Sequence, residues 1–133
     1  MAFMQWFWVG LGGALGSMLR FFLQGVVQSS LVTQFPVGTL AVNLLGSAAI
    51  GVVAGMTEIL PAQPNLRVFL MAGLLGGFTT FSAFSLDNLN LARSGQMRTL
   101  MLNVVLSNAL GLALAILGFY LARALMRALG HEI

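Results

Sequence analysis

The chain has 133 residues, of which 7% are charged and 59% are hydrophobic, and its mean hydropathy is +0.96. Soluble domains average about 25% charged residues, and a soluble fold of this length could not bury so much apolar surface. Intrinsic disorder needs the opposite composition, with low hydrophobicity and high net charge. The composition therefore predicts an integral membrane protein surrounded by the lipid bilayer.

Cysteine content and charge placement exclude further classes. The chain has no cysteine, which excludes disulfides, thiolate metal sites and cysteine nucleophiles. A nucleic-acid interface needs clustered basic residues. The six basic residues are arginines spread along the chain, and the net charge is only +3. We therefore expect no nucleic-acid partner.

Four apolar stretches are each long enough to cross a bilayer, which takes about 20 residues. Short connections with Pro, Gln, Ser, Asn and Gly separate these stretches. The sequence predicts a single all-α transmembrane domain over residues 1–133. Its four spans have the approximate bounds 6–27, 36–60, 67–89 and 99–125.

A cleaved signal peptide is the alternative interpretation of the first span. Such a peptide begins with basic residues, whereas Met1–Gln5 contains none. Trp6 and Trp8 are typical of anchors at the membrane interface. These features favour a true membrane span, and four spans then place both termini on the same side.

The arginines divide evenly between the two sides of this arrangement. The side of the termini has Arg67, Arg123 and Arg127. The other side has Arg93 and Arg98, and it also has Arg20 if the Arg20 side chain extends toward its nearer helix end. Because the bias of basic residues sets orientation, a balanced count predicts dual topology. Insertion in one orientation, set by one dominant arginine, is the alternative.

Polar residues inside the spans follow the helical period. Thr39, Asn43 and Ser47 are spaced by four and share one helix face, and Asn103 and Ser107 repeat this spacing in the fourth span. Intramembrane polar groups mark functional pathways, but Ser, Thr and Asn also join helices by hydrogen bonds. For a single Ser or Thr the joining role is the more common one. Asn43 has both donors and acceptors, so both interpretations stay open for it.

The third span contains the most informative segment, Gly76–Ser85, with the sequence GGFTTFSAFS. Two glycines and two β-branched threonines favour helix poorly, so we expect a helix broken mid-span. A break is tolerated only where protein surrounds it, and its free carbonyls and N–H groups can then bind ions. Phe81 and Phe84 alternate with hydroxyl groups, and aromatic ring edges have a positive partial charge.

Small residues recur at four-residue spacing, which is typical of closely packed membrane helices. The sets are Gly12/Gly16, Ser47/Gly51/Gly55 and Ser107/Gly111/Ala115. This pattern predicts a compact bundle. It also favours an oligomer, because four helices alone rarely enclose a pathway.

The remaining polar groups restrict the chemistry. Glu58 and Asp87 lie near span ends, so the buried carboxylate of a proton-coupled multidrug antiporter is missing. Because no nucleophile–base pair or metal cluster is visible, we expect no enzyme activity. A pathway lined by amides, hydroxyls and ring edges suits a small, strongly hydrated anion. The alternatives are a small multidrug-type exporter and a membrane subunit without transport activity.

The sequence resembles the Fluc (CrcB-type) fluoride channels over nearly its whole length. Three motifs support the resemblance: GGALG at 12–16 with Arg20, PVGTLAVNLLGS at 36–47, and the third-span segment at 76–85. The resemblance implies a passive, fluoride-selective channel that exports cytoplasmic fluoride across the bacterial inner membrane. It further implies an antiparallel, dual-topology homodimer of four-helix subunits with a structural sodium ion at the dimer axis.

The resemblance also implies roles for single residues. Asn43 corresponds to the pore-lining asparagine, and Phe81 and Phe84 to the phenylalanines whose ring edges face fluoride. The remaining assignments are Thr80, Ser82 and Ser107 to a hydroxyl track, Arg20 to a vestibule, and the backbone carbonyls of Gly76 and Thr79 to the sodium ion. The sequence departs from the family pattern at Ala83, where threonine is frequent, at Phe21, where tyrosine is common, and at Asp87, where glutamate is usual.

Overall fold

The structure, a computed structural model, describes residues 2–130. Within this range every regular element is helical, and four helical stretches are long and apolar enough to cross a membrane. The elements are α1 (Ala2–Ser29), α2 (Val37–Ile59), α3 (Pro64–Val68), η1 (Phe69–Leu75), α4 (Gly76–Phe78), α5 (Phe81–Arg93) and α6 (Met97–Ala128). The chain is therefore an all-α, multi-pass membrane protein, as its composition predicted.

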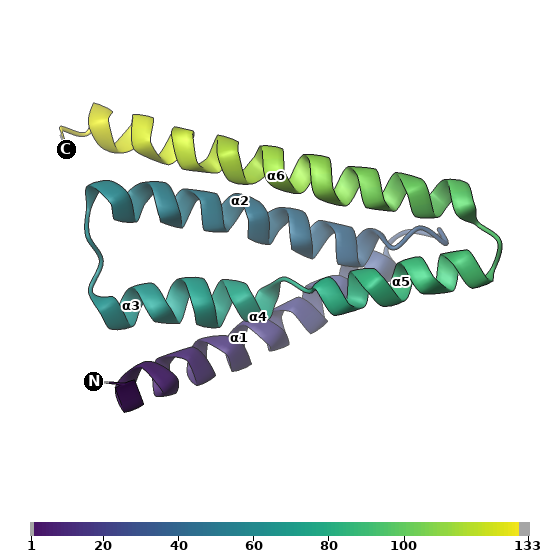
Figure 1. Cartoon of the computed structure of the whole chain (residues 1–133), viewed down its shortest axis with the longest axis horizontal. Helices are drawn as coiled ribbons and strands as arrows, with labels where there is room; N and C mark the ends of the chain where they lie inside the picture. Colours follow the sequence, from purple (N-terminus) through teal and green to yellow (C-terminus); the bar gives the residue numbers. More distant parts are fainter. Residues whose placement is uncertain (1, 131–133) are drawn as a thin grey trace.

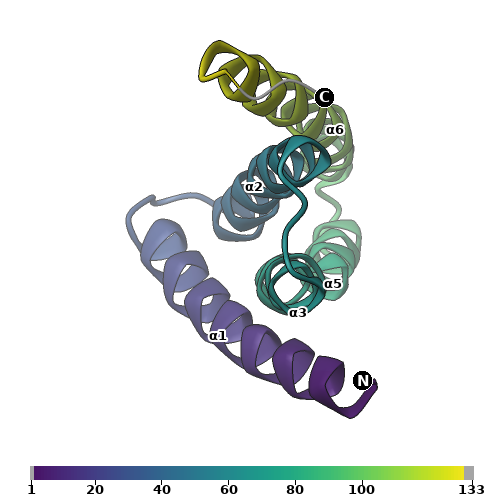
Figure 2. The same ribbon diagram turned by 90° about the vertical axis from the view of Figure 1, so that its left-hand side faces the viewer.

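The elements α3, η1, α4 and α5 follow one another along a single direction and form the third span, Pro64–Arg93 (Figure 1). Each predicted span agrees with its helical stretch to within four residues at either end. The helices α1 and α6 and the third span extend beyond the apolar runs, because a helix continues into the interface as long as its backbone bonds are made. Figure 2 shows α1 running obliquely beside the third span and α2, with α6 on the far side of α2.

Glycines allow α2 and α6 to approach each other closely. A Cβ added at Gly51 would collide with the carbonyl oxygen of Ala115, and one added at Gly118 would lie 2.6 Å from the carbonyl oxygen of Ala48. Gly111 faces Ser47, whose hydroxyl oxygen would lie 3.4 Å from an added Cβ. The small residues of these two spans therefore form the helix contact that their spacing predicted.

Glycines also allow α1 to approach the third span closely. An added Cβ at Gly12 or Gly16 would collide with the backbone at Phe69 or Leu74, respectively. On the opposite side of this contact, a Cβ at Gly77 would lie 2.6 Å from the carbonyl oxygen of Gly13. The glycine motif of the first span thus fixes α1 against the segment that precedes the threonine pair.

Amide side chains of α1 hold the start of α2. Gln28 Oε1 accepts a hydrogen bond from the Gly38 N–H at 3.1 Å, and Gln28 Nε2 donates to the Phe35 carbonyl at 3.3 Å. One turn earlier, Gln24 Nε2 donates to Thr39 Oγ1 at 3.0 Å. Thr39 is buried, and through this bond its hydroxyl joins α1 to α2. This is the role that the sequence favoured for a single threonine.

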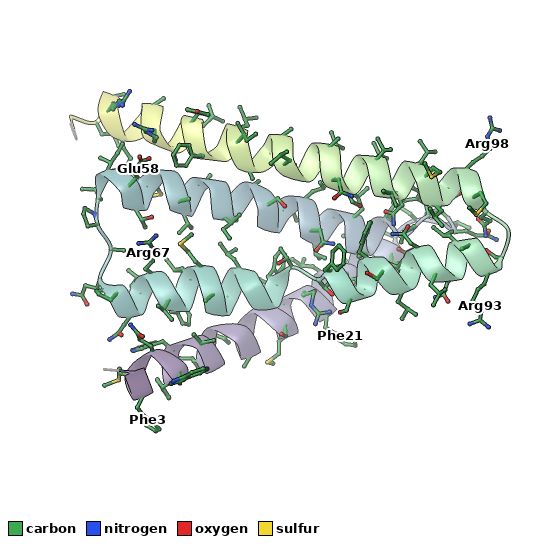
Figure 3. All side chains as sticks on the ribbon, viewed as in Figure 1. Phe3, Phe21, Glu58, Arg67, Arg93 and Arg98 are labelled. Atoms are coloured by element: carbon green, nitrogen blue, oxygen red, sulfur yellow. The ribbon has the colours of Figure 1, made fainter. Side chains whose placement is uncertain are left out.

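Charged side chains gather at the two ends of the molecule. Glu58 and Arg67 lie at one end, and Arg93 and Arg98 lie at the other (Figure 3). Arg20 is placed differently, because its Nε donates to the Gly77 carbonyl at 3.3 Å within the third span. The arginine count is therefore three against two, with Arg20 between the ends, rather than three against three.

Candidate functional site

The third span loses its helical conformation at two residues. Thr79 and Thr80 have extended backbone angles, with ψ of 155° and 114°, between the end of α4 and the start of α5. The wider π-helical turns of η1 lie earlier in the same span, and the short α4 separates them from this segment. Extended residues inside a membrane span leave backbone groups without helical partners, so these groups need substitutes from elsewhere in the protein.

Asn43 of α2 supplies two of these substitutes. Its Nδ2 donates to the Thr80 carbonyl at 3.0 Å, and its Oδ1 accepts from the Thr80 N–H at 2.8 Å. The amide side chain thus satisfies both backbone groups of Thr80. Since Nδ2 has two protons and donates one to Thr80, the second proton is available to another acceptor.

Arg20 and Ser17 of α1 satisfy the Gly77 carbonyl. Arg20 Nε donates to this oxygen at 3.3 Å and Ser17 Oγ at 3.4 Å. A guanidinium also complements the negative end of the helical segment that ends at Phe78. The structure thus brings Arg20 to the interruption, whereas the resemblance led us to expect it near a vestibule.

Two other carbonyls at the interruption lose their helical donors. In a continuous helix the Gly76 oxygen would accept from the Thr80 N–H, which instead donates to Asn43. The Thr79 oxygen would accept from the Ala83 N–H, which instead donates to Thr80 Oγ1 at 3.1 Å. These are the two carbonyls that the resemblance assigns to a sodium ion. Oxygen ligands suit a hard cation, so two carbonyls without their helical donors are chemically compatible with that expectation.

A cavity of about 290 Å³ adjoins these groups. Asn43, Gly76, Thr79, Thr80 and Phe81 all line it, so five predicted site residues lie around one space. Ser47, which shares a helix face with Asn43, lines it as well. The structure therefore brings together residues 43 and 76–81 across α2 and the third span.

The two phenylalanines stand next to each other at the start of α5. Their ring centroids lie 5.5 Å apart, with the ring planes inclined by 40°. Phe84 is half-buried, whereas Phe81 is 77% exposed in the single chain. Beside them, the hydroxyl oxygens of Thr80 and Ser82 lie 3.2 Å apart and share a hydrogen bond.

Ser107 belongs to a separate group of polar side chains. Its hydroxyl donates to Asn103 Oδ1 at 3.3 Å, and Asn103 Nδ2 donates to Asn88 Oδ1 at 3.0 Å. Asn103 is only 1% exposed. The sequence interpretation missed Asn88 and Ser17. The four-residue spacing from Phe84 to Asn88 was the available signal for the first, and nothing comparable marked the second.

A larger cavity of about 510 Å³ opens toward the end of α5, where Gln24, Gln28, Thr39 and Asp87 contribute to its lining. Asp87 Oδ2 is shielded from solvent and has no hydrogen-bond partner among residues 2–130. Around this carboxylate the cavity is rich in amide side chains. It forms a polar opening at the same end of the molecule as Arg93 and Arg98 (Figure 3).

Comparison with known proteins places the chain in a family. Residues 7–119 match the family model described as CrcB-like protein, Camphor Resistance (CrcB). Three similar relatives are each named "Fluoride-specific ion channel FluC". That of Parabacteroides distasonis is 45% identical over 113 residues, which cover 85% of this chain and 88% of the relative.

The second relative, from Thermus thermophilus, is 46% identical, and the matched region covers 89% of this chain and 94% of the relative. The third, from Aquifex aeolicus, is 43% identical, and the matched region covers 90% of this chain and 97% of the relative. These relatives are named as channels, a class of protein that conducts ions and catalyses no reaction. The chain therefore belongs to the CrcB-like family of membrane proteins, which are ion channels and not enzymes.

Proposed function

We propose that the chain is a fluoride-selective, passive ion channel that lets fluoride leave the cytoplasm across the bacterial inner membrane. The observation that supports this most strongly is the interruption at Thr79–Thr80, held open by Asn43 and followed directly by Phe81 and Phe84. The three relatives are each named as fluoride-specific ion channels, which supports the choice of anion.

The donors around the interruption suit a small anion with a strongly held water shell. Asn43 Nδ2 keeps one proton after its bond to Thr80. The hydrogen bond between the Thr80 and Ser82 hydroxyls uses one of their two protons, so the other is available to an anion. The edges of Phe81 and Phe84 add weakly positive C–H groups. Together these neutral donors replace water around fluoride without a fixed charge that would trap it.

A sodium ion is the proposed structural cofactor. The Gly76 and Thr79 carbonyls would hold it, since the interruption takes their helical donors away. When bound, the ion supplies a positive charge that neutralises the exposed carbonyl dipoles. The described residues contain no group of three or more His, Asp or Glu side chains, so backbone oxygens are the ligands this part of the chain offers.

The proposed assembly is an antiparallel, dual-topology homodimer. Phe81 and Gly76 are exposed in the single chain, and the cavity beside them is open. A second copy packed on this face would enclose both the phenylalanine rings and the free carbonyls. The near-balanced arginine ends, three against two, support insertion in both orientations.

Ion efflux from liposomes tests the function. Purified protein is reconstituted into liposomes loaded with fluoride or chloride, and an ion-selective electrode follows release after a potassium ionophore is added. Fast fluoride release with negligible chloride release is expected. Equal release of both ions, or release no faster than from protein-free liposomes, would overturn the proposal and favour a multidrug-type exporter or a non-transporting subunit.

A further inference from the structure

The hydrogen bonds among Asn88, Asn103 and Ser107 run in one direction. Ser107 gives its only hydroxyl proton to Asn103 Oδ1, and Asn103 Nδ2 donates to Asn88 Oδ1. Asn88 therefore takes part in these bonds through its oxygen, and within residues 2–130 no side-chain bond uses the two protons of its amide nitrogen. The free donors of this group lie at Asn88, whereas Ser107 has none left to offer.

The group is fixed in place by burial. Asn103 is 1% exposed inside a membrane span, where an unpaired amide is costly, so both of its polar ends need the partners that they have. Successive hydrogen bonds of the same direction also polarise one another. The result is a rigid support on α6 that orients the amide of Asn88 on α5.

Asn88 lies on the same face of α5 as the two phenylalanines. It follows Phe84 by four residues and Phe81 by seven, and both spacings return to one side of an α-helix. Four residues, or about 6 Å along the helix axis, separate Asn88 from Phe84. An anion that moves from the phenylalanine edges along this face of α5 would therefore come within one helical turn of the Asn88 amide.

We propose that Asn88 donates a hydrogen bond from Nδ2 directly to the permeating anion, and that Ser107 and Asn103 are positioning residues that orient it. This inference rests on the proposed fluoride conduction. It makes Asn88 the next hydrogen-bond donor to the anion after Asn43 and the phenylalanine edges. It also changes the expected role of Ser107. Ser107 helps to orient Asn88 and does not itself donate to the anion.

The test compares fluoride efflux from liposomes for Asn88→Asp, Asn88→Ala and Ser107→Ala, over a range of fluoride concentrations. Asn88→Asp has nearly the same shape and still accepts from Asn103, but it offers no donor to an anion. Both Asn88 variants are expected to lose about tenfold or more in flux, the size of one hydrogen bond to a charged group. The half-saturating fluoride concentration should rise in parallel. Ser107→Ala should lose about threefold or less, because the Asn88 donor remains.

Asn65→Asp is the matched control, because it adds the same charge in α3, at the opposite end of the third span from Asn88. It should keep most of the wild-type flux, and size-exclusion profiles should show equal assembly. If Asn88→Asp conducts like wild type while Asn88→Ala does not, Asn88 only supports the fold and the inference is wrong. A larger loss in Ser107→Ala than in Asn88→Asp would also overturn it. A wild-type protein that conducts no fluoride would instead refute the proposed function itself.

Discussion

At the scale of single residues, side chains replace the backbone bonds that the third span gives up. Asn43 pairs with both backbone groups of Thr80, and Arg20 with Ser17 satisfies the Gly77 carbonyl. An amide is the side chain suited to the first task, since it has a donor and an acceptor at one end. The interruption is therefore a stable part of the fold, and Asn43, Thr79 and Thr80 line the cavity beside it.

Replacing Asn43 should destabilise the protein. In Asn43→Ala the N–H and the carbonyl of Thr80 lose their partners, at a cost of about 1–3 kcal/mol for each buried group. Asn43→Asp keeps the acceptor for the N–H and should melt at an intermediate temperature. Thermal unfolding in detergent measures this order. An Asn43→Ala protein as stable as wild type would show that the two bonds contribute nothing.

Phe81→Ile and Phe84→Ile should each reduce fluoride efflux severely while the protein stays assembled. Isoleucine fills similar space but has no aromatic edge for an anion. Electrode-recorded efflux measures the loss, and Phe21→Ile is the control, because Phe21 points away from the bundle on α1 (Figure 3). Undiminished flux in both site variants would refute the role of the ring edges.

Several site residues were predictable from the sequence alone, and others were not. Asn43 and the threonine pair stood out because polar or β-branched residues in mid-span conflict with their surroundings. The bond from Arg20 to Gly77 was not predictable, because it joins residues 57 positions apart and depends on how α1 crosses the third span. Helical spacing could have indicated Asn88 but not its partner on α6.

At the scale of elements, apolar run length determined the four spans, and glycines determined how closely they approach. The sequence predicted the spans to within four residues because every helix that crosses a bilayer needs an apolar run of about 20 residues. It predicted a break in the third span only as a segment from Gly76 to Thr80. In the structure Gly76 and Gly77 are helical and only the two threonines are extended, and Gly77 makes a close contact with Gly13 of α1.

A larger residue at Gly51 should disrupt the contact between α2 and α6. In Gly51→Val the new side chain would collide with the Ala115 carbonyl, and overpacking of this kind costs about 1–3 kcal/mol. Gly25→Ala is the control, because no atom lies within 4 Å of its added Cβ. Thermal unfolding should separate the two variants clearly. Equal stability would show that α2 and α6 are not held at this distance.

At the scale of the whole molecule, the scarcity of charge leaves orientation nearly undecided. The two ends differ by a single arginine when Arg20 is counted within the bundle. Small changes in basic residues should therefore shift the balance of orientations. Phe81 is exposed in the single chain, and in the proposed dimer a copy of the opposite orientation would cover it.

The orientation can be measured with C-terminal reporter fusions that are active on only one side of the membrane. Wild-type protein should give signal from both sides. The double variant Arg93→Gln/Arg98→Gln should insert almost entirely with its termini in the cytoplasm, because only that end then keeps arginines. Signal from one side alone in the wild type would contradict the antiparallel dimer.

Passive conduction of fluoride is the central claim, and the equilibrium distribution of fluoride tests it most directly. Liposomes containing the protein are held at a series of membrane potentials set by potassium gradients, with protein-free liposomes as the reference, and internal fluoride is measured at equilibrium. A passive, fluoride-selective channel predicts a tenfold change in the fluoride ratio for every ~59 mV, unchanged by a proton gradient. A ratio that ignores the potential, or that follows the proton gradient, would contradict the account.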